Sequence, residues 1–173
     1  MKNPAPDVRV DRTFRKLKLA LFSIINENNQ EVISVSLLCK KSGISRSTFY
    51  DYFHSVQELL DYFTDQCIRD LQGGIKAFLC PENRNYIDYY CWLLNYIENN
   101  KNEFKCLYAF EKQTNFISKT DVFFLGNSDQ VCSRSRFCQY GANAIIKAWL
   151  ASDCKEPARE VAVFLAETVR CLT

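Results

Sequence analysis

The amino-acid sequence predicts an all-α protein, with a three-helix N-terminal domain over residues 1–54 joined by a long helix to a helical C-terminal domain over 55–173. Apolar residues recur with the period of an α-helix along almost the whole chain, and few segments alternate as strands do. Hydrophobic residues make up 47% of the 173 residues, which is enough to bury a sizeable core. Ser34, Ser45 and Ser55 are suited to cap helices, so they mark three helix starts in a short stretch.

The N-terminal domain is expected to contain a helix-turn-helix motif at about residues 34–53. Its first helix is predicted over about 9–28, because an apolar stripe recurs there every three or four residues. That stripe comprises Leu17, Ala20, Leu21, Ile24 and Ile25. The second and third helices are predicted over about 35–41 and 46–52. Gly43 lies between them and can adopt the left-handed conformation that commonly ends a helix.

A longer helix is expected to start at Ser55, where Glu58 three residues on completes a capping box. Its apolar face comprises Leu59, Leu60, Phe63, Cys67, Ile68 and Leu71. Gly73 and Gly74 follow, and two adjacent glycines are expected to bend or end the helix.

Further helices are predicted over about 85–99, 102–115, 133–151 and 156–172. The apolar side of the first of these is expected to comprise Ile87, Tyr90, Cys91, Leu94 and Ile97. Residues 117–135 are the least regular part of the chain, and a short helix with a loop is expected there.

Composition argues against several classes of protein. No apolar run approaches the roughly 20 residues that a membrane-spanning helix needs, and the N-terminus lacks the apolar core of a signal peptide, so a cytoplasmic location is expected. The nine cysteines are scattered without a CxxC pair, and His54 is the only histidine. We therefore expect reduced cysteines, no metal site and no cofactor. A net charge of +2 is too small to indicate a nucleic-acid partner by itself.

The helix-turn-helix segment separates apolar from polar residues onto two faces. Leu37, Leu38, Ile44, Phe49 and Phe53 can turn toward one interior. The polar residues that remain available for contact with DNA are Ser34, Ser36, Lys40, Ser45, Arg46, Ser47, Thr48, Tyr50, Tyr52 and His54. A solvated helix surface is the alternative for each basic residue taken alone, and an exposed or hydrogen-bonded role is the alternative for His54.

This segment resembles the TetR family of bacterial transcription regulators, in which a capped short helix is followed by Gly-Val-Ser and by Thr-Phe-Tyr-x-Tyr/His-Phe. The matching residues are Ser34, Cys39, Gly43, Ile44, Ser45, Thr48, Phe49, Tyr50, Tyr52, Phe53, Leu59 and Leu60. Two positions depart from the pattern. Cys39 replaces a small alanine, and Val56 replaces a lysine that often contacts phosphate.

The resemblance implies that the third helix enters the major groove of double-stranded DNA. Arg46 is the residue expected to read a base, because its planar guanidinium can contact guanine O6 and N7 together. Thr48 can touch a thymine methyl group or a phosphate, and Ser47 is small enough to let the helix lie deep. Tyr50 and Tyr52 are expected to bond phosphates through their hydroxyl groups.

The last two helices are expected to pair two copies of the chain, as in TetR-like proteins. The C-terminal run also resembles short regulators of this type from low-GC Gram-positive bacteria. The predicted interface comprises Phe137, Gly141, Ala144, Ile145, Ala148, Val161, Leu165, Thr168 and Val169. An ordinary intramolecular core is the alternative. A two-fold dimer would bind a quasi-palindromic operator.

The resemblance further implies that a small-molecule effector binds the C-terminal domain and releases a repressor from DNA. Tyr89, Tyr90, Trp92 and Tyr108 are candidate ligand-binding residues in an aromatic-rich region, although an aromatic stripe can equally be core. Transcriptional activation, and a TetR-like co-regulator that binds protein with little DNA affinity, are the alternatives. An enzyme with a cysteine nucleophile is not expected, because the only histidine lies in the DNA-contact segment.

Overall fold

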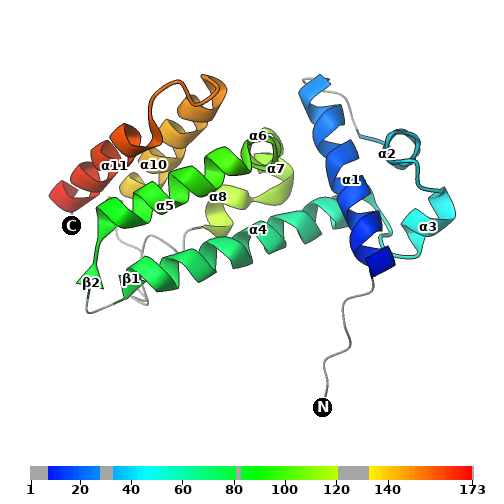
Figure 1. Ribbon diagram of the computed structural model, residues 1–173, viewed down its shortest axis with the longest axis horizontal. Helices are drawn as coiled ribbons and strands as arrows, with labels where there is room; N and C mark the ends of the chain where they lie inside the picture. Colours follow the sequence, from blue (N-terminus) through cyan, green and yellow to red (C-terminus); the bar gives the residue numbers. More distant parts are fainter. Residues whose placement is uncertain (1–7, 28–32, 81–82, 121–132, 173) are drawn as a thin grey trace, which may run out of the picture. The chain divides into compact units, whose positions relative to one another are not determined.

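The computed structural model describes residues 8–27, 33–80, 83–120 and 133–172, and these residues are helical almost throughout (Figure 1). This confirms the predicted all-α fold. The chain divides into two compact units, Met1–Phe63 (unit 1) and Thr64–Thr173 (unit 2). None of the helices within the described ranges is long and apolar enough to cross a bilayer.

Unit 1 contains α1 (Val8–Glu27), α2 (Val35–Ser42), α3 (Arg46–Tyr50) and the first turns of α4 (Val56–Phe78). The whole predicted stripe of α1 is buried, from Leu17 to Ile25. Helix α3 ends two residues earlier than predicted, because the backbone N–H groups of Tyr52 and Phe53 both bond the Phe49 carbonyl in a turn. Residue 28, the predicted end of the first helix, lies outside the described residues.

An aromatic cluster extends unit 1 beyond the predicted domain boundary at residue 54. The Phe14 ring lies 5.2 Å from Phe53 and 5.1 Å from Tyr62, measured between centroids, and Phe53 lies 5.7 Å from Tyr62. Leu59 and Leu60 are buried in the same unit. The first two turns of α4 thus pack as part of unit 1, which moves the boundary to Phe63.

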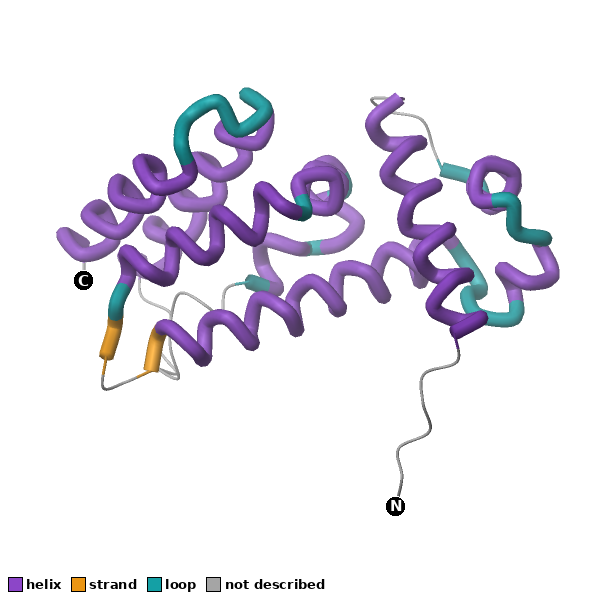
Figure 2. Tube along the Cα trace, in the orientation of Figure 1, coloured by secondary structure: helices purple, strands orange, loops and turns teal. Residues whose placement is uncertain are grey.

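Unit 2 contains the rest of α4 together with six further helices and a very short antiparallel strand pair. The helices are α5 (Tyr86–Asn99), α6 (Lys101–Ala109), α7 (Glu111–Thr114), α8 (Phe116–Lys119), α10 (Ser133–Ala151) and α11 (Ala158–Leu172). The strands β1 (Leu79–Cys80) and β2 (Asn83–Arg84), which the sequence did not predict, lie between α4 and α5 (Figure 2).

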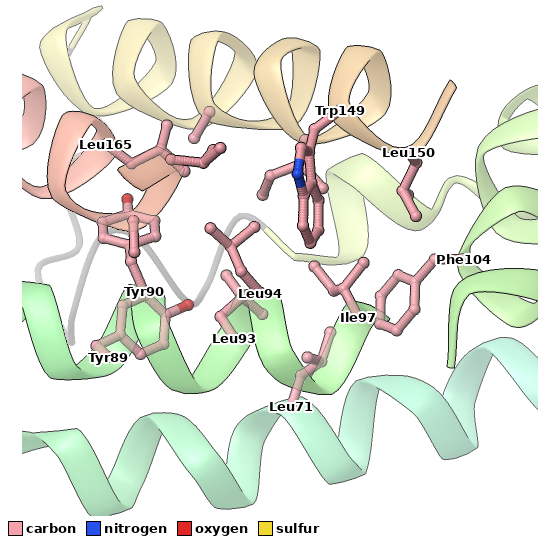
Figure 3. Close-up of a cluster of buried hydrophobic side chains, with 14 of the residues drawn as sticks. Leu71, Tyr89, Tyr90, Leu93, Leu94, Ile97, Phe104, Trp149, Leu150 and Leu165 are labelled. Carbon is pink, nitrogen blue, oxygen red and sulfur yellow. The ribbon is translucent and has the colours of Figure 1, made fainter. Parts of the chain in front are cut away.

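The core of unit 2 forms where α11 and α10 pack along α5. Tyr90, Leu94 and Ile97 are buried on α5, as the predicted stripe requires, but Ile87 is 43% exposed at the start of the helix. Figure 3 shows the Trp149 side chain of α10 directed toward Leu94 and Ile97. The aromatic residues of α5 thus contribute mainly to the core.

The predicted helix over 102–115 is interrupted. Helix α6 ends at Ala109, and α7 begins after Phe110. Asn115 then adopts a left-handed conformation with φ of 50°, which separates α7 from α8. Asparagine tolerates this conformation better than most residues, so the chain turns there without a glycine.

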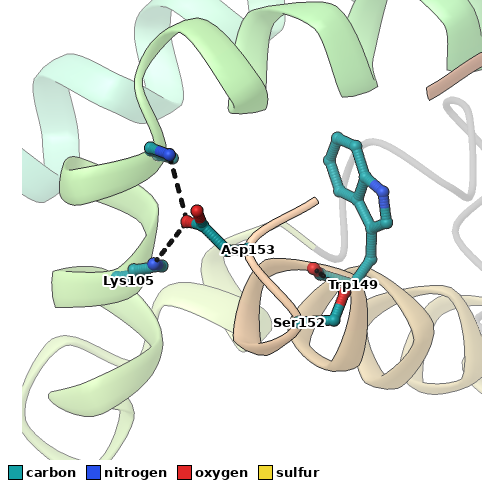
Figure 4. Close-up of polar contacts among 5 residues, drawn as sticks. Lys105, Trp149, Ser152 and Asp153 are labelled. Atoms are coloured by element: carbon teal, nitrogen blue, oxygen red, sulfur yellow. Dashed lines mark hydrogen bonds and ion pairs between the residues drawn. The ribbon is translucent and has the colours of Figure 1, made fainter. Parts of the chain in front are cut away.

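The turn between α10 and α11 is fastened to α6 by two ion pairs. Asp153 Oδ1 lies 3.0 Å from Lys101 Nζ and 3.2 Å from Lys105 Nζ (Figure 4). Hydrogen bonds from both lysines lower the pKa of the Asp153 carboxyl. The Trp149 indole N–H donates to the Glu156 carbonyl at 2.8 Å across the same turn. These contacts fix the relative position of α6, α10 and α11 inside unit 2.

Gly73 and Gly74 lie inside α4 and neither end nor replace it, contrary to the prediction. The two positions differ in their surroundings. A Cβ atom on Gly73 would meet no neighbour, whereas one on Gly74 would overlap the ring of Trp92 on α5. Gly74 therefore allows α4 and α5 to approach closely, and Trp92 fills the space.

The two glycines give a matched pair of stability predictions. Gly74→Ala is expected to lower the free energy of unfolding by about 1–3 kcal/mol, because Trp92 has to move out of its packed position. Gly73→Ala is expected to raise it by about 0.5–1 kcal/mol through helix propensity alone. Urea denaturation followed by tryptophan fluorescence measures both. Equal effects at the two positions would contradict the close approach of Trp92 to Gly74.

Candidate functional site

The helix-turn-helix segment is held by capping contacts at each helix start. Ser34 Oγ accepts from the Leu37 N–H at 3.2 Å, and Ser45 Oγ accepts from the Thr48 N–H at 3.0 Å. Gly43 adopts a φ of 64°, the left-handed conformation expected at the end of α2. These three positions turn the chain sharply between α2 and α3.

The start of α4 is capped as the sequence predicted, with one shift. Ser55 Oγ accepts from the Glu58 N–H at 3.1 Å. The Glu58 carboxylate accepts in return from the N–H of His54, one residue before Ser55, at 2.6 Å. The His54 backbone is thereby fixed while its side chain is exposed.

The apolar and polar faces of the segment separate as predicted. Leu38, Phe49 and Phe53 are at most 3% exposed, while Leu37 and Ile44 are half-buried. The exposed candidates for DNA contact are Ser34, Ser36, Lys40, Ser45, Arg46, Ser47, Tyr50, Tyr52 and His54. Thr48 is half-buried, with its hydroxyl 2.8 Å from that of Ser45. The structure thus places these side chains on a short, accessible stretch of unit 1.

Arg46 and Ser36 form a contact that the sequence did not predict. Arg46 Nη2 donates to Ser36 Oγ at 2.7 Å, so the first residue of α3 is tied to the first turn of α2. Cys39 lies buried close by, where burial raises the pKa of its thiol and the Arg46 charge opposes that rise. The Arg46 side chain is thus exposed and also held in direction.

The two tyrosines of this surface are supported by rings beneath them. Tyr50 is 51% exposed and its ring meets Phe49 edge-on at 5.6 Å. Tyr52 is 38% exposed and packs edge-on against Phe14 of α1 at 5.3 Å. Packing on one side leaves the polar end of each residue near solvent, as contact with a phosphate requires.

A second feature is an exposed apolar stripe on α10 and α11. Phe137 is 67% exposed, Tyr140 52% and Phe164 56%. Ala144 and Ala148 continue the α10 stripe at the surface, and Gly141 and Thr168 are half-buried in it. A Cβ atom on Gly141 would meet nothing within unit 2. Exposed aromatic residues beside small ones are typical of a surface that another helix covers.

The structure changes the membership of the predicted interface. Val161, Leu165 and Val169 are buried in the core of unit 2, and Ile145 packs against that core. These four residues therefore take the intramolecular role that the sequence left open. Tyr140 and Phe164, which the sequence reasoning missed, are exposed instead. Their signal was a large aromatic residue beside an already complete apolar stripe.

A third feature is a small cavity of about 30 Å³ inside unit 2. It is lined by Leu71, Tyr89, Leu93, Ile97, Phe104, Tyr108, Phe116, Thr120, Asn143 and Ile146. Of the four predicted ligand-binding residues, Tyr89 and Tyr108 therefore line it. Tyr90 is buried in the core, and Trp92 packs between Gly74 and the ring of Tyr96, which it stacks on at 5.6 Å.

No model of a known protein family matches the sequence, and no curated protein matches it either. Solved structures with the same fold do match. One is titled dihydroxyacetone kinase operon activator DhaS, with 20% identity, a TM-score of 0.52, and coverage of 92% of this chain and 94% of that one. Another is the fatty acid degradation regulator FadR from Bacillus halodurans, with 14% identity, a TM-score of 0.56, and coverage of 97% and 96%. At these identities the likeness establishes the shared helical fold.

Proposed function

We propose that the protein is a TetR-like, sequence-specific DNA-binding transcription regulator that acts as a homodimer. The observation that carries the proposal is the polar surface of α2 and α3, where Arg46 is exposed beside hydroxyl groups while Phe49 and Phe53 fill the interior. The full-length fold shared with solved regulators supports it.

In this proposal α3 lies in the major groove, with Arg46 at its first turn. The guanidinium reads guanine through O6 and N7, and the small Ser47 beside it permits a close approach. Ser45, Thr48, Tyr50 and the residues of α2 contact the backbone, which fixes the register without reading sequence. Lys40 is exposed for a phosphate, whereas Lys41 is engaged by Glu27 of α1.

Two copies are proposed to pair through the exposed stripe of α10 and α11. Three aromatic side chains more than half exposed would leave water in such a pairing, and Gly141 would allow the helices to approach. The resulting two-fold symmetry implies a quasi-palindromic operator with its half-sites about one DNA turn or slightly more apart.

The sign of control is proposed to be repression, released by a small-molecule effector in unit 2. Leu71 lies in the wall of the cavity and belongs to α4, the helix that starts in unit 1. A cytoplasmic location follows from this role. The proposal assigns no catalytic activity, since His54, the only histidine available as a base, belongs to the proposed DNA-contact surface.

The deciding experiment is selection of genomic DNA fragments by the purified protein, followed by titration at several salt concentrations. A symmetric motif is expected, with affinity falling steeply as salt rises, because each phosphate contact releases counterions. Recovery of no motif, together with a salt-independent background, would instead favour the protein-binding co-regulator, for which the valine at position 56 is an argument. A reporter gene placed behind the recovered site then distinguishes repression from activation.

Ser36 gives a prediction that is specific to this chain. Ser36→Ala removes the hydrogen bond that directs Arg46, so preference at the base read by Arg46 is expected to fall by about 0.5–1.5 kcal/mol. Ser36→Thr keeps a hydroxyl and should restore most of it. The measurement is the relative affinity for operators that differ at single positions. A uniform loss at every position would indicate that Ser36 contacts the DNA backbone instead.

A further inference from the structure

The cavity of unit 2 has apolar walls drawn from five helical segments. Leu71 comes from α4, Leu93 from α5, Phe104 from α6, Phe116 from α8 and Ile146 from α10. No lysine, arginine, aspartate or glutamate is among the lining residues within the part of the chain that the structure describes. A charged ligand would lose its hydration there without gaining an opposite charge, which costs several kcal/mol.

One end of the cavity is polar and lies where α8 meets α10. The Tyr108 hydroxyl donates to Asn143 Oδ1 at 2.8 Å, and Asn143 Nδ2 donates to the carbonyl of Gln139 at 3.1 Å. Thr120 Oγ1 and Gln139 Nε2 both donate to the Ile117 carbonyl, at 2.7 Å and 2.8 Å. The Gln139 side chain is thereby held next to two residues of the lining, Thr120 and Asn143.

Gln139 carries an unpaired acceptor at this end. The residue is fully buried, and its Oε1 atom has no hydrogen-bond partner among the residues described here. A buried carbonyl oxygen without a donor is costly, and buried polar atoms in folded proteins are nearly always paired. The atom is suited to accept from a hydroxyl or N–H group of a bound molecule.

The nearest carboxylate makes an anionic ligand still less favourable. Glu111 accepts from the Ile117 N–H at 3.0 Å, and burial raises its pKa. Its charge also contributes to the raised pKa of the Tyr108 hydroxyl, which places it in the electrostatic neighbourhood of the lining. A carboxylate or phosphate ligand would be repelled from the side on which Tyr108 lies.

We propose that this cavity binds a small, uncharged and mainly apolar molecule that donates one hydrogen bond to the side-chain carbonyl of Gln139. At about 30 Å³ the cavity is much smaller than the roughly 150 Å³ that holds a benzene ring in other proteins. Binding therefore moves the walls, which include Leu71 of α4. The inference rests on the proposed function for its regulatory meaning, since the molecule would be the effector.

Four single-ring probes of similar size test the chemistry on the full-length protein without DNA. Benzyl alcohol is neutral with a donor, toluene is neutral without one, benzoate is an anion, and benzylammonium is a cation. Dissociation constants come from thermal shift and from ligand-observed NMR. Benzyl alcohol is expected to bind about three- to tenfold more tightly than toluene, since one hydrogen bond is gained. Both charged probes are expected to bind at least about tenfold more weakly than the alcohol.

Variants assign the effect to this cavity. Gln139→Met should reduce the preference for the alcohol over toluene to less than about twofold, whereas the matched change Gln72→Met, at an exposed position of α4, should leave it intact. Ile146→Phe should weaken all neutral probes by filling the space. If Gln139→Met does not fold, the alcohol-to-toluene ratio of the wild-type protein and Ile146→Phe decide.

Several outcomes would overturn the proposal. They are benzoate or benzylammonium binding as tightly as the alcohol, toluene matching the alcohol, no probe binding at all, or Ile146→Phe binding like the wild type. Because these measurements use no DNA, such a failure leaves DNA recognition untouched. Loss of the operator motif in fragment selection would conversely leave the cavity chemistry standing.

Discussion

Arg46→Ala is expected to lower affinity for the selected operator by about 2–6 kcal/mol, because each protomer of the dimer loses a bidentate contact worth about 1–3 kcal/mol. The loss should fall on one base position in each half-site, where the preference for guanine disappears. The capping bonds of Ser45 involve Thr48 and not the Arg46 side chain, so the fold of α3 should persist. Fluorescence anisotropy with operators substituted at single positions gives the comparison.

Tyr50→Phe is the matched control for Arg46→Ala. It removes only a hydroxyl group from an exposed side chain of the same helix and leaves the ring contact with Phe49 in place. Binding to every sequence should weaken by a similar factor, of the order of a few-fold, because a phosphate contact does not read bases. An Arg46→Ala protein that keeps the wild-type base preference would show that another side chain reads the DNA.

The helix-turn-helix segment was predictable because its signals are local. Ser34, Gly43 and Ser45 act on atoms within four residues of themselves, and the apolar spacing of Phe49 and Phe53 directly sets which face is buried. The direction of the Arg46 side chain was not predictable in the same way. Its partner Ser36 lies ten residues away and depends on the angle between α2 and α3.

Where tertiary packing overrides local preference, the sequence prediction failed. Gly73 and Gly74 favour a break in an isolated helix, yet α4 continues because Gly74 lets Trp92 of α5 lie against the backbone. Ile87 fits the apolar period of α5 but stands near its start, where it is exposed. Periodicity identifies an apolar face and does not reveal how far along the helix a neighbour covers it.

The last two helices show a further limit of periodicity, since each has two apolar faces. On α11 the regular stripe through Val161, Leu165 and Val169 proved to be core, and Phe164 lies outside it. On α10 the buried face includes Gln139 and Asn143, whose polar side chains conceal it in a hydropathy pattern. The same two residues define the polar end of the cavity, so the feature that obscured the core face also marked a site.

Gly141→Arg is expected to separate the proposed dimer and with it abolish tight operator binding. A Cβ atom at this position meets nothing within unit 2, so the monomer should fold normally and gain slightly from the loss of a helical glycine. In the dimer the arginine would stand between closely packed helices with its like-charged copy nearby. Its burial should cost about 3 kcal/mol or more, which is on the order of a 100-fold weaker association.

Gly73→Arg is the matched control for this dimer test, because it also places arginine at a helical glycine where an added Cβ is free of contacts. Sedimentation equilibrium over a range of concentrations measures association, and anisotropy compares whole operators with single half-sites. Gly141→Arg should bind a half-site about as well as the wild-type protomer does while losing the gain from the second half-site, since only the coupling between protomers is removed. If Gly141→Arg sediments as the wild type does, the stripe that contains Phe137 and Tyr140 is not the pairing surface, and its exposed aromatic residues require a different partner.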